Sequence, residues 1–103
     1  MSQIIENVLV KFDGFNEKGD ILATPEDKSI FQKLMSQNVD FVPIVGNQLK
    51  IRLTRYNKDI NPNTYIGKYA RCILRTKVFR FPKQGTPEII KSLIIYLNHM
   101  DIV

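Results

Sequence analysis

A period of two along the sequence marks two parts of the chain as β-strands. In residues 48–55 apolar and polar residues alternate strictly, with Leu49, Ile51 and Leu53 at every second position. Residues 65–81 form the longest strand-like segment, and every second residue near the centre of 68–81 is small or apolar. Because successive side chains of a strand point to opposite faces, this period of two predicts two strands, each with one face able to pack on a core.

Three further segments favour extended structure. Residues 3–12 are rich in β-branched residues and predict a first strand, and residues 21–23 predict a short one. Residues 39–45 are apolar but contain Pro43, which cannot donate a backbone hydrogen bond. We therefore expect that segment to be an edge strand or an extended linker.

Residues 25–37 carry the clearest helix signal. Pro25 suits the first helical position, where a backbone N–H has no partner within the helix, and Thr24 can cap the helix. The apolar residues that fall on one face at helical spacing are Ile30, Phe31, Leu34 and Met35. The pattern predicts one amphipathic helix that packs on the sheet.

The last eighteen residues fit either a helix or a strand. Thr86-Pro87-Glu88 has the composition of a helix start, whereas the run from Ser92 to Leu97 is rich in β-forming residues. We expect a final strand over about residues 93–103, with a helical turn before it.

These elements predict a β-rich α+β fold in a single domain over residues 1–103, since a chain of this length suits one compact unit. The architecture is expected to be a small antiparallel sheet or an OB-like barrel with one clear helix, at about residues 25–37. An OB barrel usually places its helix between its third and fourth strands. Here the helix precedes both alternating strands, so another α+β arrangement stays open.

The charges are segregated along the chain. Residues 49–83 hold ten Lys or Arg and one acid, Asp59, whereas residues 1–48 have a net charge of −3 and residues 84–103 of −1. An ordinary solvated surface mixes the two signs. This distribution predicts one positive face on a neutral to acidic body, suited to a polyanion.

One alternating set within residues 68–81 combines cations with aromatic rings. Binding a single nucleic-acid strand requires both, because cations meet the phosphates and flat rings stack on unpaired bases. If residues 48–55 and 68–81 pair side by side, they make one basic sheet face. The candidate binding residues are Lys50, Arg52, Arg55, Tyr56, Lys68, Tyr69, Arg71, Arg75, Lys77, Phe79 and Phe81.

Three functions stay open, and the first is our leading hypothesis. It is a non-enzymatic module that binds single-stranded DNA or RNA. The second is a protein-interaction module, such as a viral or phage-type accessory factor, that binds an acidic protein surface. The third is a small toxin-type ribonuclease that uses Arg71, Arg75 and His99. A purely structural alternative also stays open, in which a bulge turns Phe79 and Phe81 into the core.

Few residues are available for other chemistry. The single cysteine, Cys72, excludes an intramolecular disulfide, and with the single His99 it makes a zinc site improbable. A lone cysteine inside an apolar run is typically a small buried hydrophobe. The chain contains no Walker loop, dinucleotide-binding glycine pattern or nucleophile elbow. We expect no cofactor, no metal and no catalytic residue.

The location follows from similar exclusions. No run approaches the ~20 apolar residues needed to span a bilayer, and the N-terminus lacks a signal-peptide pattern. We expect an intracellular, soluble protein, cytoplasmic or nuclear, with no membrane partner. A homodimer through Ile73, Ile94 or an edge strand near Pro43 stays open.

Overall fold

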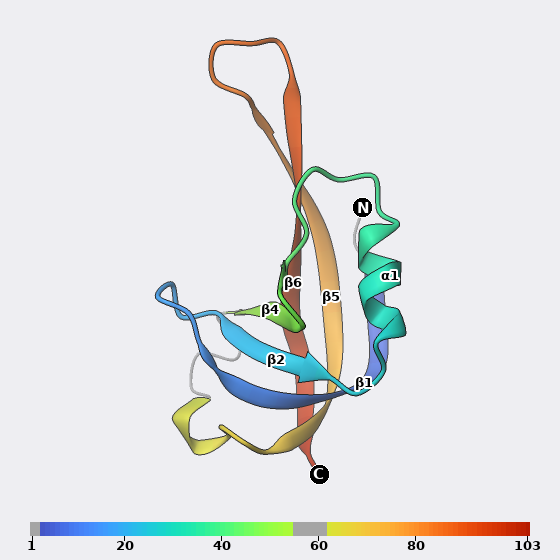
Figure 1. Cartoon of the computed structure of the whole chain (residues 1–103), viewed down its shortest axis with the longest axis vertical. Coiled ribbons are helices and arrows are strands. Elements are labelled where there is room, and N and C mark those ends of the chain that lie inside the picture. Colours follow the sequence, from blue (N-terminus) through green and yellow to red (C-terminus); the bar gives the residue numbers. More distant parts are fainter. Residues whose placement is uncertain (1–2, 55–61) are drawn as a thin grey trace.

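The computed structural model describes residues 3–54 and 62–103, which form a β-rich α+β fold with one α-helix in that part of the chain (Figure 1). The strands are β1 (Gln3–Phe15), β2 (Ile21–Pro25), β3 (Ile44–Val45), β4 (Gln48–Leu53), β5 (Tyr69–Pro82) and β6 (Ile89–Ile102). The helix is α1 (Ser29–Met35), and η2 (Pro62–Thr64) is a short 3-10 helix. The fold class expected from the sequence is confirmed.

Five strands close into a ring. Around it, the order is β1, β2, β4, β6, β5 and back to β1, and β3 adds a short edge beside β4. Among the named strands of the described chain, β4 and β6 are the parallel pair, and the other neighbours are antiparallel. Closure of this kind is barrel-like and removes the exposed edges of an open sheet. The helix follows the second strand of the ring, not the third as in a typical OB barrel.

The core fills the inside of this ring. Alternate residues of each barrel strand point inward, as the period of two predicts. Its buried residues are Val8, Val10, Phe12, Ile21, Ala23, Ile30, Leu34, Leu49, Ile51, Ala70, Cys72, Leu74, Leu93, Ile95 and Leu97. Two of these, Ile30 and Leu34, come from α1, so the helix contributes its apolar face to the barrel core.

Extra residues in two strands allow the sheet to bend. The register of β1 against β5 shifts between Ile5 and Val8, and Asn7 in this interval adopts a left-handed φ of 57°. In β6, Asn98 is passed over, because Ile73 pairs with His99 while the next residue pairs with Leu97. Bulges raise the local twist and bend a strand, which helps a small ring to close.

The helix begins later than the sequence predicts. Residues up to Pro25 belong to β2, where Pro25 pairs with Val10 and Thr24 with Lys11. The Thr24 hydroxyl donates to Asp13 Oδ2 at 2.6 Å and therefore does not cap the helix. Proline is tolerated at the end of a strand, where no ladder hydrogen bond is lost, so sheet pairing prevails over the helix-start signal.

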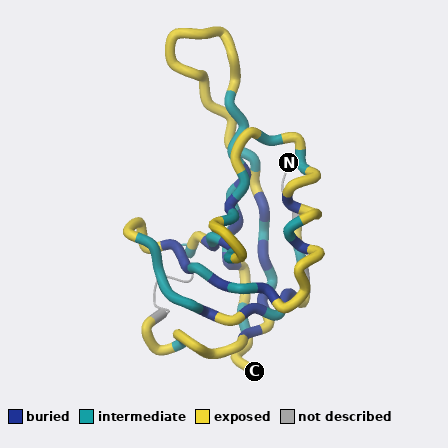
Figure 2. Tube along the Cα trace, viewed as in Figure 1, coloured by how far each residue is buried: buried dark blue, intermediate teal, exposed yellow. Residues whose placement is uncertain are grey.

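The C-terminal segment is a strand from Ile89, without the expected helical turn before it. Residues 83–88 form the loop of a β5–β6 hairpin, in which Lys83 N donates to Glu88 O at 2.9 Å. The far part of this hairpin projects beyond the barrel as a two-stranded arm (Figure 1). The arm is largely exposed, whereas the buried residues lie in the barrel (Figure 2).

Cys72 lies inside the barrel and is 1% exposed, as a small buried hydrophobe should be. Burial, with a smaller contribution from the Asp101 carboxylate, raises the pKa of its thiol to about 12. Only the thiolate reacts readily with alkylating agents. We therefore expect iodoacetamide to label the native protein far more slowly than the guanidinium-unfolded protein at mildly alkaline pH, as measured by intact mass. Equal labelling rates would contradict a closed wall at β5.

In the described part of the chain, no helix is long and apolar enough to cross a membrane.

Candidate nucleic-acid interface

The alternation of β5 divides its side chains between the core and the outside. Ala70, Cys72 and Leu74 point inward and are buried, while Arg71 and Lys77 are exposed on the opposite face. β5 pairs with β6 without interruption from residue 74 to residue 82. The bulge lies in β6, so the outward register of β5 continues along the arm.

The rings of the arm are therefore accessible. Phe79 is 37% exposed and Phe81 44%, and each lies on the same face of β5 as Lys77. Tyr69, at the opposite end of the strand, is also exposed. This geometry does not agree with the structural alternative, in which a bulge turns these rings into the core.

The two basic strands are not neighbours, contrary to the side-by-side pairing expected from the sequence. β6 lies between β4 and β5 and pairs with both. Tyr96 of β6 pairs with Arg52 on one side and with Arg75 on the other. Paired residues of neighbouring strands direct their side chains to the same face, so the three strands still present one outer surface.

We call this surface the basic outer face. It comprises these outward-pointing residues of β4, β6 and β5: Lys50, Arg52, Tyr69, Arg71, Ile73, Arg75, Lys77, Phe79, Phe81, Ile90, Ser92, Ile94, Tyr96, His99 and Asp101.

Cations flank the central strand β6 in two rows across the strands. One row is Arg52, Tyr96 and Arg75. In the next row, Lys77 pairs with Ile94. Ile94 in turn lies beside Lys50, because the residues that follow these two, Ile95 and Ile51, are paired. Strands lie about 4.8 Å apart and alternate residues about 7 Å apart along a strand. Four cations therefore lie within a short distance of one another.

Arg75 is held in place by its neighbour Tyr96. Its guanidinium carbon lies 5.2 Å from the centre of the Tyr96 ring, a cation–π contact. Its Nε is buried and has no hydrogen-bond partner in the described structure. Lys77 makes a similar contact, with Nζ 5.1 Å from the centre of the Phe79 ring. Both cations are thus positioned beside an aromatic surface.

Two acids reach this face from outside the basic segment. Asp20, in the turn before β2, places Oδ1 3.7 Å from Arg52 Nε, and Asp101 pairs with Arg71 across β5 and β6. Five cations of β4 and β5 on the basic outer face therefore meet two described carboxylates. The face keeps an excess of positive charge, although it is less uniform than the sequence implies.

The candidate residues do not form one cluster. Tyr69 lies ten residues along β5 from Phe79, a distance of about 33 Å on a strand. Lys68 precedes β5 at that far end, where its carbonyl accepts from Phe12 N at 3.0 Å. Among the candidate rings, Phe79 and Phe81 of the arm, not Tyr69, are therefore the ones that continue the surface from Lys77. Arg55 and Tyr56 lie outside the described residues.

Sequence reasoning missed two rings on this surface. Tyr96 lies in the segment that was open between helix and strand, although inward-facing Leu93, Ile95 and Leu97 mark it as an outward position. Phe41 is 57% exposed and forms a parallel bridge with Ser92, which pairs with Phe79. The row Phe41, Ser92, Phe79 places a second ring close to the cations. No local pattern in residues 39–45 indicates this contact.

Among the described residues, Asp101 is the acid that lies beside His99. The two side chains are both well exposed, with His99 Nε2 3.3 Å from Asp101 Oδ1. His99 pairs with Ile73, between the rows that hold Arg71 and Arg75.

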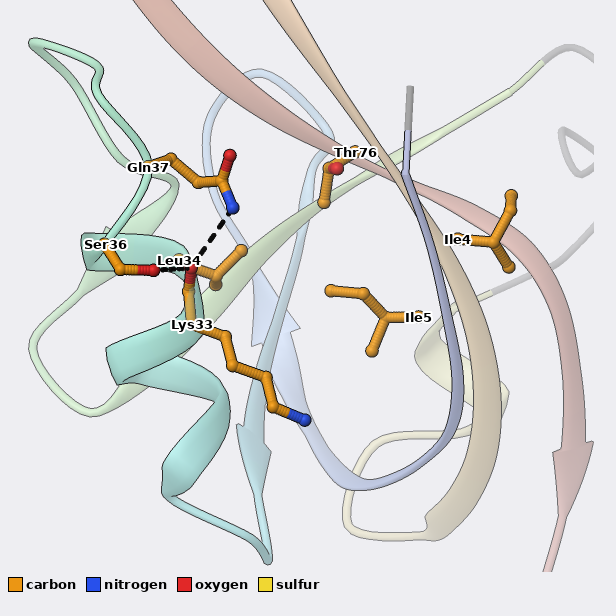
Figure 3. A pocket seen from close by; sticks show the side chains of 7 residues that line it. All are labelled: Ile4, Ile5, Lys33, Leu34, Ser36, Gln37 and Thr76. Carbon is orange, nitrogen blue, oxygen red and sulfur yellow. Dashed lines mark hydrogen bonds between the residues drawn. The ribbon is translucent and has the colours of Figure 1, made fainter. Parts of the chain in front are cut away.

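A cavity of about 420 Å³ lies elsewhere, between α1 and the N-terminal end of β1 (Figure 3). Its walls are Ile4, Ile5, Lys33, Leu34, Ser36, Gln37 and Thr76. Ile4 and Ile5 point to opposite sides of β1, and Ser36 Oγ donates to the Lys33 carbonyl at 2.9 Å. With one cation and no ring among these residues, this cavity lacks the chemistry of a strand-binding site.

Within residues 3–54 and 62–103, no group of three His, Cys, Asp or Glu side chains lies close enough together to hold a metal ion. No family model matches the chain, and comparisons with curated proteins and with solved structures also found no match. The basic outer face is therefore the feature of the molecule that bears on its function.

Proposed function

We propose that the protein binds single-stranded nucleic acid, DNA or RNA, through the basic outer face and acts without catalysis. The observation that carries this proposal is the placement of aromatic rings next to cations on one sheet surface. Lys77 lies against Phe79, and Arg75 against Tyr96. A surface whose charges serve only to keep the protein in solution does not need aromatic rings at these positions.

Each component of the face matches one component of a single strand. The cations Lys50, Arg52 and Lys77 can neutralise successive phosphates, which supplies affinity without sequence selectivity. The exposed rings Phe79 and Phe81 can stack on unpaired bases, at about 1–3 kcal/mol per base. A duplex hides the faces of its bases, so the rings favour a single strand over a duplex of equal charge.

The acidic-partner alternative predicts a different dependence on the rings. An acidic protein surface would use the same cations but would offer no stacking faces. Poly-glutamate is therefore a matched competitor, because it has the charge of a strand and lacks bases.

The test is fluorescence anisotropy with a labelled single-stranded oligonucleotide, the matching duplex, and poly-glutamate as a competitor. We expect the single strand to bind most tightly and Phe79→Ala to weaken its binding by about 5- to 150-fold, the effect of one lost stacking contact. Phe79→Leu is the control: it keeps an apolar side chain but removes the ring, and should weaken binding almost as much. Binding that is absent even at low salt would overturn the proposal, as would poly-glutamate binding with the same dependence on Phe79.

A further inference from the structure

A second cavity opens on the basic outer face, where the β1–β2 turn, β4 and residues 41–43 meet. Its volume is about 300 Å³. Its walls include Lys18 and Asp20 from the turn, Lys50 and Arg52 from β4, and Phe41 and Ile94. It is continuous with the rows described above, because Lys50 and Ile94 belong to both.

The walls of this cavity combine two chemistries. Lys18, Lys50 and Arg52 supply positive charge. Phe41 and Ile94, with the apolar residues 42–43, supply apolar surface. A ligand that fits both combines a flat apolar ring system with an anion. Small-molecule sites measure about 300–1,000 Å³, so this cavity can take one small unit and no more.

Asp20 fixes the position of Arg52 in the wall of the cavity. It is 5% exposed and locked by Asn16, whose Nδ2 donates to Asp20 Oδ2 at 3.2 Å and whose Oδ1 accepts from Asp20 N at 2.9 Å. Its other carboxylate oxygen faces Arg52 Nε at 3.7 Å. Asp20 therefore positions Arg52 at the cavity, and the three cations Lys18, Lys50 and Arg52 outnumber this one carboxylate.

We propose that this cavity, the base pocket, holds one nucleotide of the bound strand, with its base against Phe41 and its phosphate next to Lys18 and Lys50. This inference rests on the proposed function and adds a defined position to it. The row Phe41, Ser92, Phe79 continues from the pocket rim to the arm, so the strand can pass from the pocket onto the second ring.

The test uses two oligonucleotides of equal length and charge. One consists entirely of abasic sites, and the other carries a single thymine in an otherwise abasic backbone. The thymine should raise the affinity of the unmodified protein by about 5- to 150-fold, the effect of one stacked base. Phe41→Ala should remove most of this gain, while Met35→Ala, the loss of an exposed apolar side chain on α1 outside the basic outer face, should leave it.

The outcomes separate the inference from the proposed function. If the gain from thymine survives Phe41→Ala and is lost in Phe81→Ala, the base pocket is wrong and single-strand binding through the arm stands. A thymine that adds no affinity to an abasic strand that does bind would also overturn the pocket. If neither oligonucleotide nor any natural single strand binds at low salt, the proposed function fails as well. Phe41→Leu, which keeps apolar volume, should lose most of the gain too and guards against misfolding of Phe41→Ala.

Discussion

Raising the salt concentration from 50 to 200 mM should weaken single-strand binding by about 100-fold. Five cations of β4 and β5 lie on the basic outer face, namely Lys50, Arg52, Arg71, Arg75 and Lys77. If each neutralises one phosphate of a single strand, the slope of log affinity against log salt is roughly −3.5, because each contact contributes about −0.7. A fourfold increase in salt then lowers the affinity by about two orders of magnitude. Anisotropy titrations at several salt concentrations measure this slope directly.

Arg71→Ala tests whether that slope comes from the basic outer face. Arg71 is exposed and should reduce the magnitude of the slope by about 0.7 when removed. Arg75 is a poorer choice, because it packs on Tyr96 and its loss would also remove that contact. Arg80 is the matched control, since it lies on β5 but points to the opposite face. An Arg80→Ala variant that flattens the slope as much as Arg71→Ala would show that net charge, not this face, governs binding.

The parts of this surface that sequence could predict are those set by local alternation. Leu49 and Ile51 point inward on β4, and Arg71 and Lys77 point outward on β5, as a period of two requires. This pattern depends only on each strand having one face in the core. The orientation of nearly every candidate side chain on β5 could therefore be read before the fold was known.

The order of the strands could not be predicted in the same way. It depends on closure of the ring, in which β6 reaches β4 in parallel and β5 in antiparallel orientation. No local signal in residues 89–102 shows that this strand divides the two basic strands. As a result, the contribution of Tyr96 and the contact of Phe41 with the face arise from tertiary structure alone.

The predictions of a helix start at residue 25 and of a helical turn before the last strand were wrong for a related reason. Thr24-Pro25 and Thr86-Pro87 both have the composition of a helix N-terminus, yet one ends β2 and the other lies in the hairpin loop. Proline fixes φ and lacks an N–H, and these properties suit a strand end or a turn as well as a helix start. Long-range pairing decides between these uses, so the local signal was ambiguous at both sites.

Ile95→Ala should destabilise the protein by about 2–5 kcal/mol, the usual cost of truncating a buried isoleucine to alanine. Ile95 is 0% exposed and lies between Ile51 of β4 and Thr76 of β5. Its loss leaves a space at the point where three barrel strands meet. For a domain of this size such a change is a large fraction of the total stability, and urea denaturation followed by circular dichroism measures it.

Ile89→Ala is the matched control, because it makes the same substitution in the same strand at a residue that is 56% exposed on the arm. It should cost no more than about 1 kcal/mol, the span of intrinsic strand preferences. Equal losses from the two variants would mean that the arm is packed as tightly as the barrel, contrary to its exposure.

Ile95 also lies between Ile94 and Tyr96, which point to the basic outer face. Folded Ile95→Ala should therefore still bind a single strand with an unchanged salt slope, since the barrel positions the face while the outward side chains make the contacts.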